Sequence, residues 1–169
     1  MNSLTKPIDV FLQPGDFFVG DARHRISTLL GSCVSITLWH PERRIGAISH
    51  FLLSSRNPDG AASGLDARYG QEAMSLMLQE LRRLGVSPTE CIGKIFGGGD
   101  MFPDQARPGM INVGQKNGES ARSLLISEGI QVVSESLFGI GHRQVIFDII
   151  SGDVWARQIK PFVPPFIRH

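Results

Sequence analysis

The chain is constrained most by three strand-like segments that lie close together in its first third. Residues 26–30, 34–39 and 45–53 are rich in β-branched and aromatic side chains, which pack well in β-sheets. A Gly-Ser pair interrupts the run between the first two segments, and His-Pro-Glu-Arg at residues 40–43 is a turn signal between the last two. These features predict a β-hairpin formed by residues 34–39 and 45–53.

Two helices and further strands are indicated by the rest of the chain. Either Ser63 or Asp66 is the expected N-cap of the first helix, which should end at Gly85. The second helix has Asn117 as its expected N-cap and Gly129 just past its end. The remaining segments with strand character are residues 10–12, 17–19, 92–96, 131–134, 144–149 and 154–159.

The order of these elements is strands, helix, strand, helix and strands. This order predicts an α+β or layered α/β fold with mixed β-sheets flanked by two main helices. A chain of 169 residues, 41% of them hydrophobic, can bury a core without disulfides or metals, so we expect a single domain over residues 1–169. Residues 161–169 contain paired prolines and are expected to form neither a helix nor a central strand.

Charge and hydropathy argue against several kinds of partner. The net charge is +1 and no run of five like charges occurs, so we expect no nucleic-acid partner. No stretch of about 18 apolar residues is present, and the first residues lack the apolar segment of a signal peptide. We therefore expect a cytoplasmic protein without membrane insertion. The histidines are scattered without zinc-type spacing, so neither a metal nor a cofactor is expected.

A thiol stands at the break between the first two strand-like segments. Cys33 follows Gly31 and Ser32, and such a break leaves backbone N–H groups outside the strand ladder. Free amides beside a thiol are what an oxyanion hole requires. A lone cysteine is also typical of a small buried apolar residue. We interpret Cys91, which begins an apolar strand, in that second way.

His50 is the candidate base for this thiol. If the hairpin has a four-residue loop at residues 40–43, or a two-residue loop within it, the register places Cys33 directly opposite His50. Directly opposed residues have Cβ atoms about 4.5 to 5.5 Å apart. An imidazole at this distance can take the thiol proton and hold the thiolate as an ion pair. Cys33 is therefore expected to have a low pKa and to react faster than Cys91 near neutral pH.

A third group usually orients the imidazole in such a pair. Ser27 and Thr28 are the nearest hydroxyls in the sequence, and both are also compatible with an ordinary solvated strand face. Further along the chain, Gly-Gly-Gly-Asp at residues 97–100 lacks the Lys and Ser or Thr of a phosphate loop. We interpret it as a close backbone approach beside the sheet that carries the thiol.

Several motifs follow one another in a specific order along nearly the whole chain. They are Ser-Thr-Leu-Leu-Gly-Ser-Cys33-Val, Ile45-Gly-Ala-Ile-Ser-His50-Phe-Leu-Leu, Ala67-Arg-Tyr-Gly, Lys94-Ile-Phe-Gly-Gly-Gly-Asp-Met-Phe102, Asn112-Val-Gly followed by Asn117, and Arg143-Gln-Val-Ile-Phe147. In this order they resemble the CheD family of chemoreceptor glutamine deamidases. The order is more specific than any one motif.

The resemblance implies a cysteine hydrolase that converts glutamine side chains in the cytoplasmic helices of methyl-accepting chemotaxis receptors to glutamate, with release of ammonia. Some members of the family also cleave the glutamyl methyl ester, so the resemblance implies this as a further activity. By position, Cys33 is the nucleophile and His50 the base, and Ser27 stands where the family has a threonine. Backbone amides near Gly31 and Ser32 are expected to hold the oxyanion.

Two other functions are compatible with these residues. One is a non-catalytic regulatory module that binds chemoreceptors or a CheC-type phosphatase, the partner that the family resemblance suggests. The other is a cysteine amidase or peptidase with a different substrate. Thiol-directed labelling separates the enzymes from the regulatory module, because a decayed site should show no preference for Cys33 over Cys91. Peptide cleavage products separate a peptidase from a deamidase.

Overall fold

Two β-sheets form the framework of the protein. Within residues 5–59, 63–105 and 108–160, which the computed structural model describes, nine strands are present. The five-stranded sheet has the order β2-β5-β4-β6-β7 and the four-stranded sheet the order β1-β3-β8-β9. The strands are β1 (Ile8–Phe11), β2 (Phe17–Asp21), β3 (His24–Leu30), β4 (Val34–His40), β5 (Ile45–Ser49), β6 (Ile92–Gly97), β7 (Gln131–Leu137), β8 (His142–Asp148) and β9 (Val154–Ile159).

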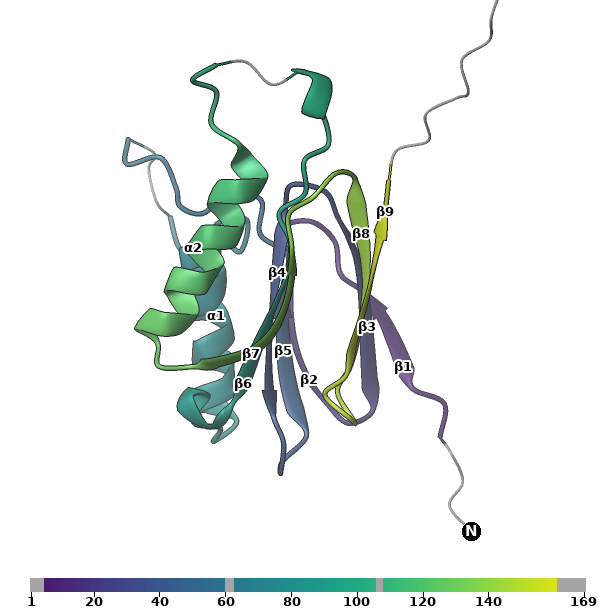
Figure 1. The fold of residues 1–169 in the computed structure, drawn as a ribbon. Coiled ribbons are helices and arrows are strands. Elements are labelled where there is room, and N and C mark those ends of the chain that lie inside the picture. The colour runs from purple at the N-terminus through teal and green to yellow at the C-terminus, as the bar shows by residue number, and fades with distance from the viewer. Residues whose placement is uncertain (1–4, 60–62, 106–107, 161–169) are drawn as a thin grey trace, which may run out of the picture.

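The elements are arranged in three layers (Figure 1). Helices α1 (Gly70–Arg83) and α2 (Val113–Ser127) cover one face of the five-stranded sheet, and the four-stranded sheet packs against its other face. Each sheet contains one parallel pair, β1 with β3 and β6 with β7, so both sheets are mixed. The predicted fold class is therefore confirmed, with both helices on the same outer side.

Apolar residues fill the two interfaces between these layers. One cluster lies between the helices and the five-stranded sheet and includes Val34, Ile36 and Leu38 of β4. A second cluster lies between the two sheets and includes Ile26 and Ile48. The central strand β4 is buried on both faces, which explains why its sequence is a nearly continuous apolar run.

The hairpin of β4 and β5 forms as predicted, but its register is displaced by two residues. His40 pairs with Ile45, so the four-residue loop comprises residues 41–44 instead of 40–43. His40 stays in the strand because its side chain is buried and its Nε2 lies 2.9 Å from Glu90 Oε2. Arg44 closes the loop with a φ of 49°. Since an even displacement preserves the alternation of faces, the same side chains still point the same way.

The predicted starts of both helices were wrong, while their predicted ends were right. Tyr69 precedes α1 and makes no capping bond with its side chain. At α2, the cap is Asn112, whose Oδ1 accepts a hydrogen bond from the Gln115 N–H at 2.9 Å. Gly85 and Gly129 follow the helices with φ of 77° and 69°, a conformation that favours glycine.

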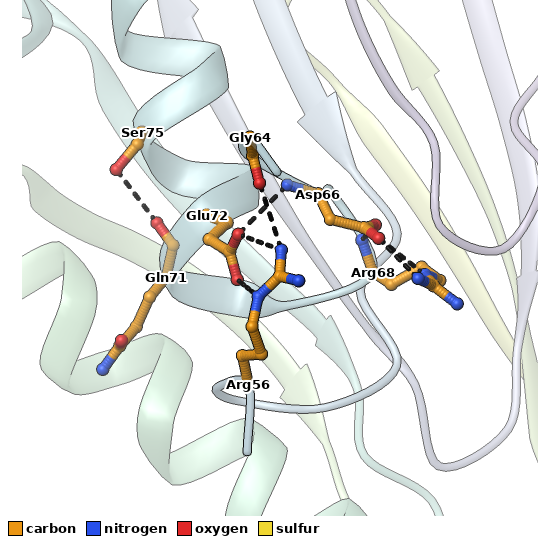
Figure 2. A network of polar contacts seen from close by, with 7 residues as sticks. All are labelled: Arg56, Gly64, Asp66, Arg68, Gln71, Glu72 and Ser75. Carbon is orange, nitrogen blue, oxygen red and sulfur yellow. Dashed lines mark hydrogen bonds and ion pairs between the residues drawn. The ribbon is translucent and has the colours of Figure 1, made fainter. Parts of the chain in front are cut away.

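An ion-pair network secures the loop before α1 (Figure 2). Arg56 binds Glu72 through two nitrogens and donates to the carbonyl of Gly64. Glu72 also accepts the backbone N–H of Asp66 at 3.2 Å. In place of a side-chain cap, the carbonyls of Leu53 and Ser54 accept the first N–H groups of α1. Asp66 instead pairs with Arg68. This network fixes the segment that follows His50.

The predicted irregular tail, residues 161–169, lies outside the described residues. Among the described helices, none is both long and apolar enough to cross a membrane.

Candidate active site

The two sheets bring His50 and Thr28 into contact. His50 follows β5 and lies two residues after Ile48, whose side chain packs between the sheets. Its Nδ1 lies 2.7 Å from Oγ1 of Thr28 on β3, and both side chains are 1% exposed. The Thr28 hydroxyl also donates to the carbonyl of Leu12 at 2.8 Å. A buried hydrogen-bond chain therefore runs from β5 through β3 to the residue after β1.

This chain determines which nitrogen of the imidazole carries the proton. A hydroxyl has a single hydrogen, and that of Thr28 is donated to the Leu12 carbonyl, which can only accept. Thr28 Oγ1 must therefore accept its second bond from an Nδ1–H of His50. In the neutral imidazole, the lone pair then lies on Nε2. His50 thus presents Nε2 as a free base.

Ser27 does not make this contact. The side chains of β3 alternate between faces, and Ile26, Thr28 and Leu30 are the buried set. Among the hydrogen bonds of the described residues, none joins the Ser27 side chain to His50. The geometry therefore assigns the hydroxyl beside His50 to Thr28, the alternative that the sequence left open.

Cys33 lies on the same side of the five-stranded sheet as His50. In β4, Thr37 pairs with Ile48, so residues 33, 35 and 37 share a face with residues 48 and 50. Cys33 is half-buried and packs against Leu30, Phe96 and Val145. Val145 is the register partner of Thr28. Cys33 and His50 therefore both lie against the β3–β8 pair.

The two residues are not directly opposed, however, which corrects the predicted pairing. Val34 pairs with Phe51, and continuing this register places Leu52 opposite Cys33. The displaced hairpin loop is the cause. His50 is consequently a diagonal neighbour of the cysteine, at the roughly 7–8 Å spacing of such pairs in regular sheets.

Backbone groups of the glycine-rich run hold the segment that carries Cys33. The N–H groups of Gly98 and Gly99 donate to the carbonyls of Cys33 and Gly31, each at 2.9 Å. Gly97 has a φ of 113°, and a side chain there would clash with the carbonyl oxygen of Cys33. The predicted close backbone approach is thus confirmed, and it explains why three glycines stand together.

Burial keeps both groups of the pair neutral in the resting protein. Burial raises the pKa of the Cys33 thiol above its ordinary value. Burial also lowers the pKa of His50 to about 4, against a smaller opposing effect from Asp16. Both shifts favour a neutral thiol and a neutral imidazole over the expected thiolate–imidazolium pair. Cys91 is buried too, and its pKa is raised to about 11, chiefly by burial.

A hollow of about 270 Å³ opens beside the segment that carries the thiol. Its lining includes Ser32, Gly99 and Asn112. Large apolar side chains around it are solvent-exposed, namely Phe102 (67%), Met110 (61%) and Ile111 (70%). Exposed apolar residues gathered at a concave site are typical of a surface that binds another molecule.

Groups suited to metal binding are not gathered in the described part of the chain. No cluster of three or more His, Cys, Asp or Glu side chains occurs there. The residues on this side of the five-stranded sheet include a thiol and an imidazole that contacts a hydroxyl. They are suited to acyl transfer through a covalent intermediate.

One residue of the site was missed by sequence reasoning. Asn117, predicted as a helix cap, lies inside α2 and is 1% exposed. Its Nδ2 donates to the carbonyls of Ser32 and Leu52, at 3.1 and 2.8 Å. The spacing of Asn117 with the buried Ala121 and Leu125 is the signal that could have identified it, because it places a polar residue on the buried stripe of the helix.

Comparisons with known proteins point to one family. The family model "CheD chemotactic sensory transduction" matches residues 52–158. "Probable chemoreceptor glutamine deamidase CheD 2" of Albidiferax ferrireducens is 61% identical over 161 residues, covering 95% of this chain and 93% of the relative. "Probable chemoreceptor glutamine deamidase CheD 3" of Dechloromonas aromatica is 46% identical, covering 87% and 85%.

A more distant relative and a solved structure extend the comparison. "Probable chemoreceptor glutamine deamidase CheD" of Pseudomonas savastanoi pv. phaseolicola is 39% identical, covering 94% of this chain and 89% of the relative. The hypothetical protein YfiH of Bacillus licheniformis has a TM-score of 0.43 and is 18% identical, covering 72% of this chain and 50% of its own. The family match and the identities over nearly full length show that this chain belongs to the CheD family.

Proposed function

We propose that this protein is a cytoplasmic deamidase that converts glutamine side chains of chemoreceptors to glutamate and releases ammonia. The names of its relatives support the substrate and the reaction. The observation that carries the proposal is the buried Thr28–His50 contact, which leaves Nε2 of His50 free as a base on the sheet face that also bears Cys33. Because both sheets contribute to this site, we propose that the chain is one functional domain.

In the proposed first half-reaction, Sγ of Cys33 attacks the side-chain amide carbon of glutamine as Nε2 of His50 takes the thiol proton. The carbonyl oxygen becomes an oxyanion, held by the backbone N–H groups of Ser32 and Cys33. The intermediate collapses when His50 returns the proton to the amide nitrogen, which leaves as ammonia. A thioester between Cys33 and the substrate remains.

In the second half-reaction, Nε2 of His50 takes a proton from water, whose oxygen attacks the thioester carbon. Collapse breaks the carbon–sulfur bond, and the departing thiolate of Cys33 recovers the proton from His50. The product is the glutamate side chain. A glutamyl methyl ester presents the same carbonyl group, so the proposal includes its hydrolysis to glutamate and methanol.

Thr28 takes the orienting role in this proposal, in place of Ser27. By accepting the Nδ1–H bond, Thr28 holds the tautomer in which Nε2 can accept a proton. The exposed side chains of Phe102, Met110 and Ile111 support a protein substrate, because a receptor helix can cover apolar surface that free glutamine cannot.

The direct test measures conversion of glutamine to glutamate in a co-expressed receptor fragment. Each modified site gains about 1 Da by mass spectrometry, the difference between an amide and an acid, with release of ammonia. Cys33→Ala should abolish the conversion, and Cys91→Ala is the matched control that should leave it intact. Conversion that persists in Cys33→Ala contradicts the mechanism. A wild-type protein that binds the fragment without converting it would instead support the regulatory module.

A further inference from the structure

The side chain of Asn117 bonds to both segments that carry the proposed catalytic pair. One Nδ2 hydrogen goes to the carbonyl of Ser32, directly before Cys33, and the other to the carbonyl of Leu52, two residues after His50. Oδ1 accepts the hydroxyl of Ser54 at 3.2 Å. Every strong hydrogen-bonding group of this amide except one lone pair is therefore engaged, which is how a buried polar side chain acquires a single orientation.

The bond to Ser32 determines where the next amide points. The described residues contain no cis peptide bond, so the C=O of Ser32 and the N–H of Cys33 point in opposite directions across one rigid plane. A partner that holds the carbonyl on the α2 side therefore directs the N–H of Cys33 away from α2. The orientation of this peptide plane is thus set from the helix layer.

The neighbouring carbonyls have partners of a different kind. Those of Gly31 and Cys33 accept backbone N–H groups of Gly99 and Gly98. The carbonyl of Ser32 lies between them and relies on a side chain. Within residues 5–59, 63–105 and 108–160, no backbone or side-chain acceptor outside Cys33 takes the N–H groups of Ser32 and Cys33. An oxyanion hole requires preorganised N–H donors of this kind, and the three bonded carbonyls hold the peptides that carry them.

We propose that Asn117 is a positioning residue that holds the Ser32–Cys33 peptide in the orientation in which the Cys33 N–H faces the oxyanion. This inference rests on the proposed deamidase function. Asn117 acts through the peptide plane and does not contact the substrate. Its removal should therefore lower kcat and leave KM nearly unchanged.

The principal variant is Asn117→Leu, which is similar in size and cannot donate a hydrogen bond. Loss of one oxyanion donor typically reduces kcat by about 10²–10³-fold, and a loosened donor should cost less, roughly 10- to 100-fold. Alkylation of Cys33 by iodoacetamide needs the thiolate but forms no oxyanion. Its rate should therefore stay within about twofold of wild type. The control is Leu125→Ala, which weakens packing of the same helix face but leaves the bonds to the Ser32 and Leu52 carbonyls in place. Its kcat per folded molecule should match that of the wild type.

A second variant, Asn117→Asp, keeps the shape and tests the same bond if Asn117→Leu does not fold. An ionised carboxylate only accepts hydrogen bonds, whereas the protonated acid donates one. Its kcat relative to wild type should therefore rise as pH is lowered from 8 to about 5.5, a dependence that lost packing does not produce.

Three results would overturn the inference. They are an unchanged kcat in both Asn117 variants, a loss of alkylation in parallel with deamidation, and a kcat of Asn117→Asp relative to wild type that does not depend on pH. A wild-type protein without deamidase activity would overturn the proposed function and this inference together, which distinguishes the two failures.

Discussion

Replacing Thr28 by valine tests the orientation of His50 most directly. Valine has nearly the shape of threonine, so the change removes the hydroxyl and little else. Two buried groups then lose their partner, the Nδ1–H of His50 at 2.7 Å and the carbonyl of Leu12 at 2.8 Å. Each unsatisfied buried polar group costs about 1–3 kcal/mol, so the free energy of unfolding should fall by roughly 2–6 kcal/mol.

The effect on catalysis follows from the same bond. A neutral hydrogen bond contributes about 0.5–1.5 kcal/mol, and with the lost orientation of the ring we expect kcat to fall roughly 10- to 100-fold. The assay is ammonia release from a receptor fragment, with urea unfolding of each variant to give the folded fraction. Thr28→Ser should recover most of the loss, because it restores the hydroxyl.

Ser27→Ala provides the matched control one residue away. Its side chain makes no contact with His50 among the described hydrogen bonds, so kcat should stay near the wild-type value. A fall in kcat of Ser27→Ala that equals the fall in Thr28→Val would refute the assignment of Thr28. A Thr28→Val protein with full activity would refute the need for an oriented imidazole.

Further predictions concern pH, the glycine run and the exposed apolar surface. Because burial lowers the pKa of His50 to about 4, the acidic limb of kcat/KM should have its midpoint near that pH; a midpoint near 6.5 contradicts the buried site. The same shift makes the unfolded protein bind more protons than the folded protein between pH 6.5 and about 4. Lowering the pH across this range should therefore reduce the free energy of unfolding, measured in urea, by up to about 3 kcal/mol, and His50→Gln should lack this dependence. Gly97→Ala should reduce both stability and Cys33 alkylation, because a side chain at a φ of 113° clashes with the Cys33 carbonyl. Gly109→Ala is strained too, at a φ of 80°, but meets no atom of the described residues within 4 Å and should spare alkylation. Ile111→Glu should raise KM for receptor fragments several-fold without changing Cys33 alkylation; parallel loss of both would argue against a docking role.

The sequence alone determined most of the local structure. Runs of β-branched residues, the existence of a turn between β4 and β5 and the glycines after both helices are local signals, because they act through backbone conformation and side-chain alternation. The same alternation placed Cys33 and His50 on one face, since an error of two residues in the register does not change the face.

Only the tertiary structure decided which side chains meet at the site. Thr28 and Ser27 are adjacent hydroxyls, and what separates them is which face of β3 packs on the five-stranded sheet. Asn117 reaches the site because α2 crosses the segments that carry Cys33 and His50. Its bonding partners Ser32 and Leu52 lie 85 and 65 residues before it in the chain. Contacts between layers arise from packing over such separations, and no local pattern of residues encodes them.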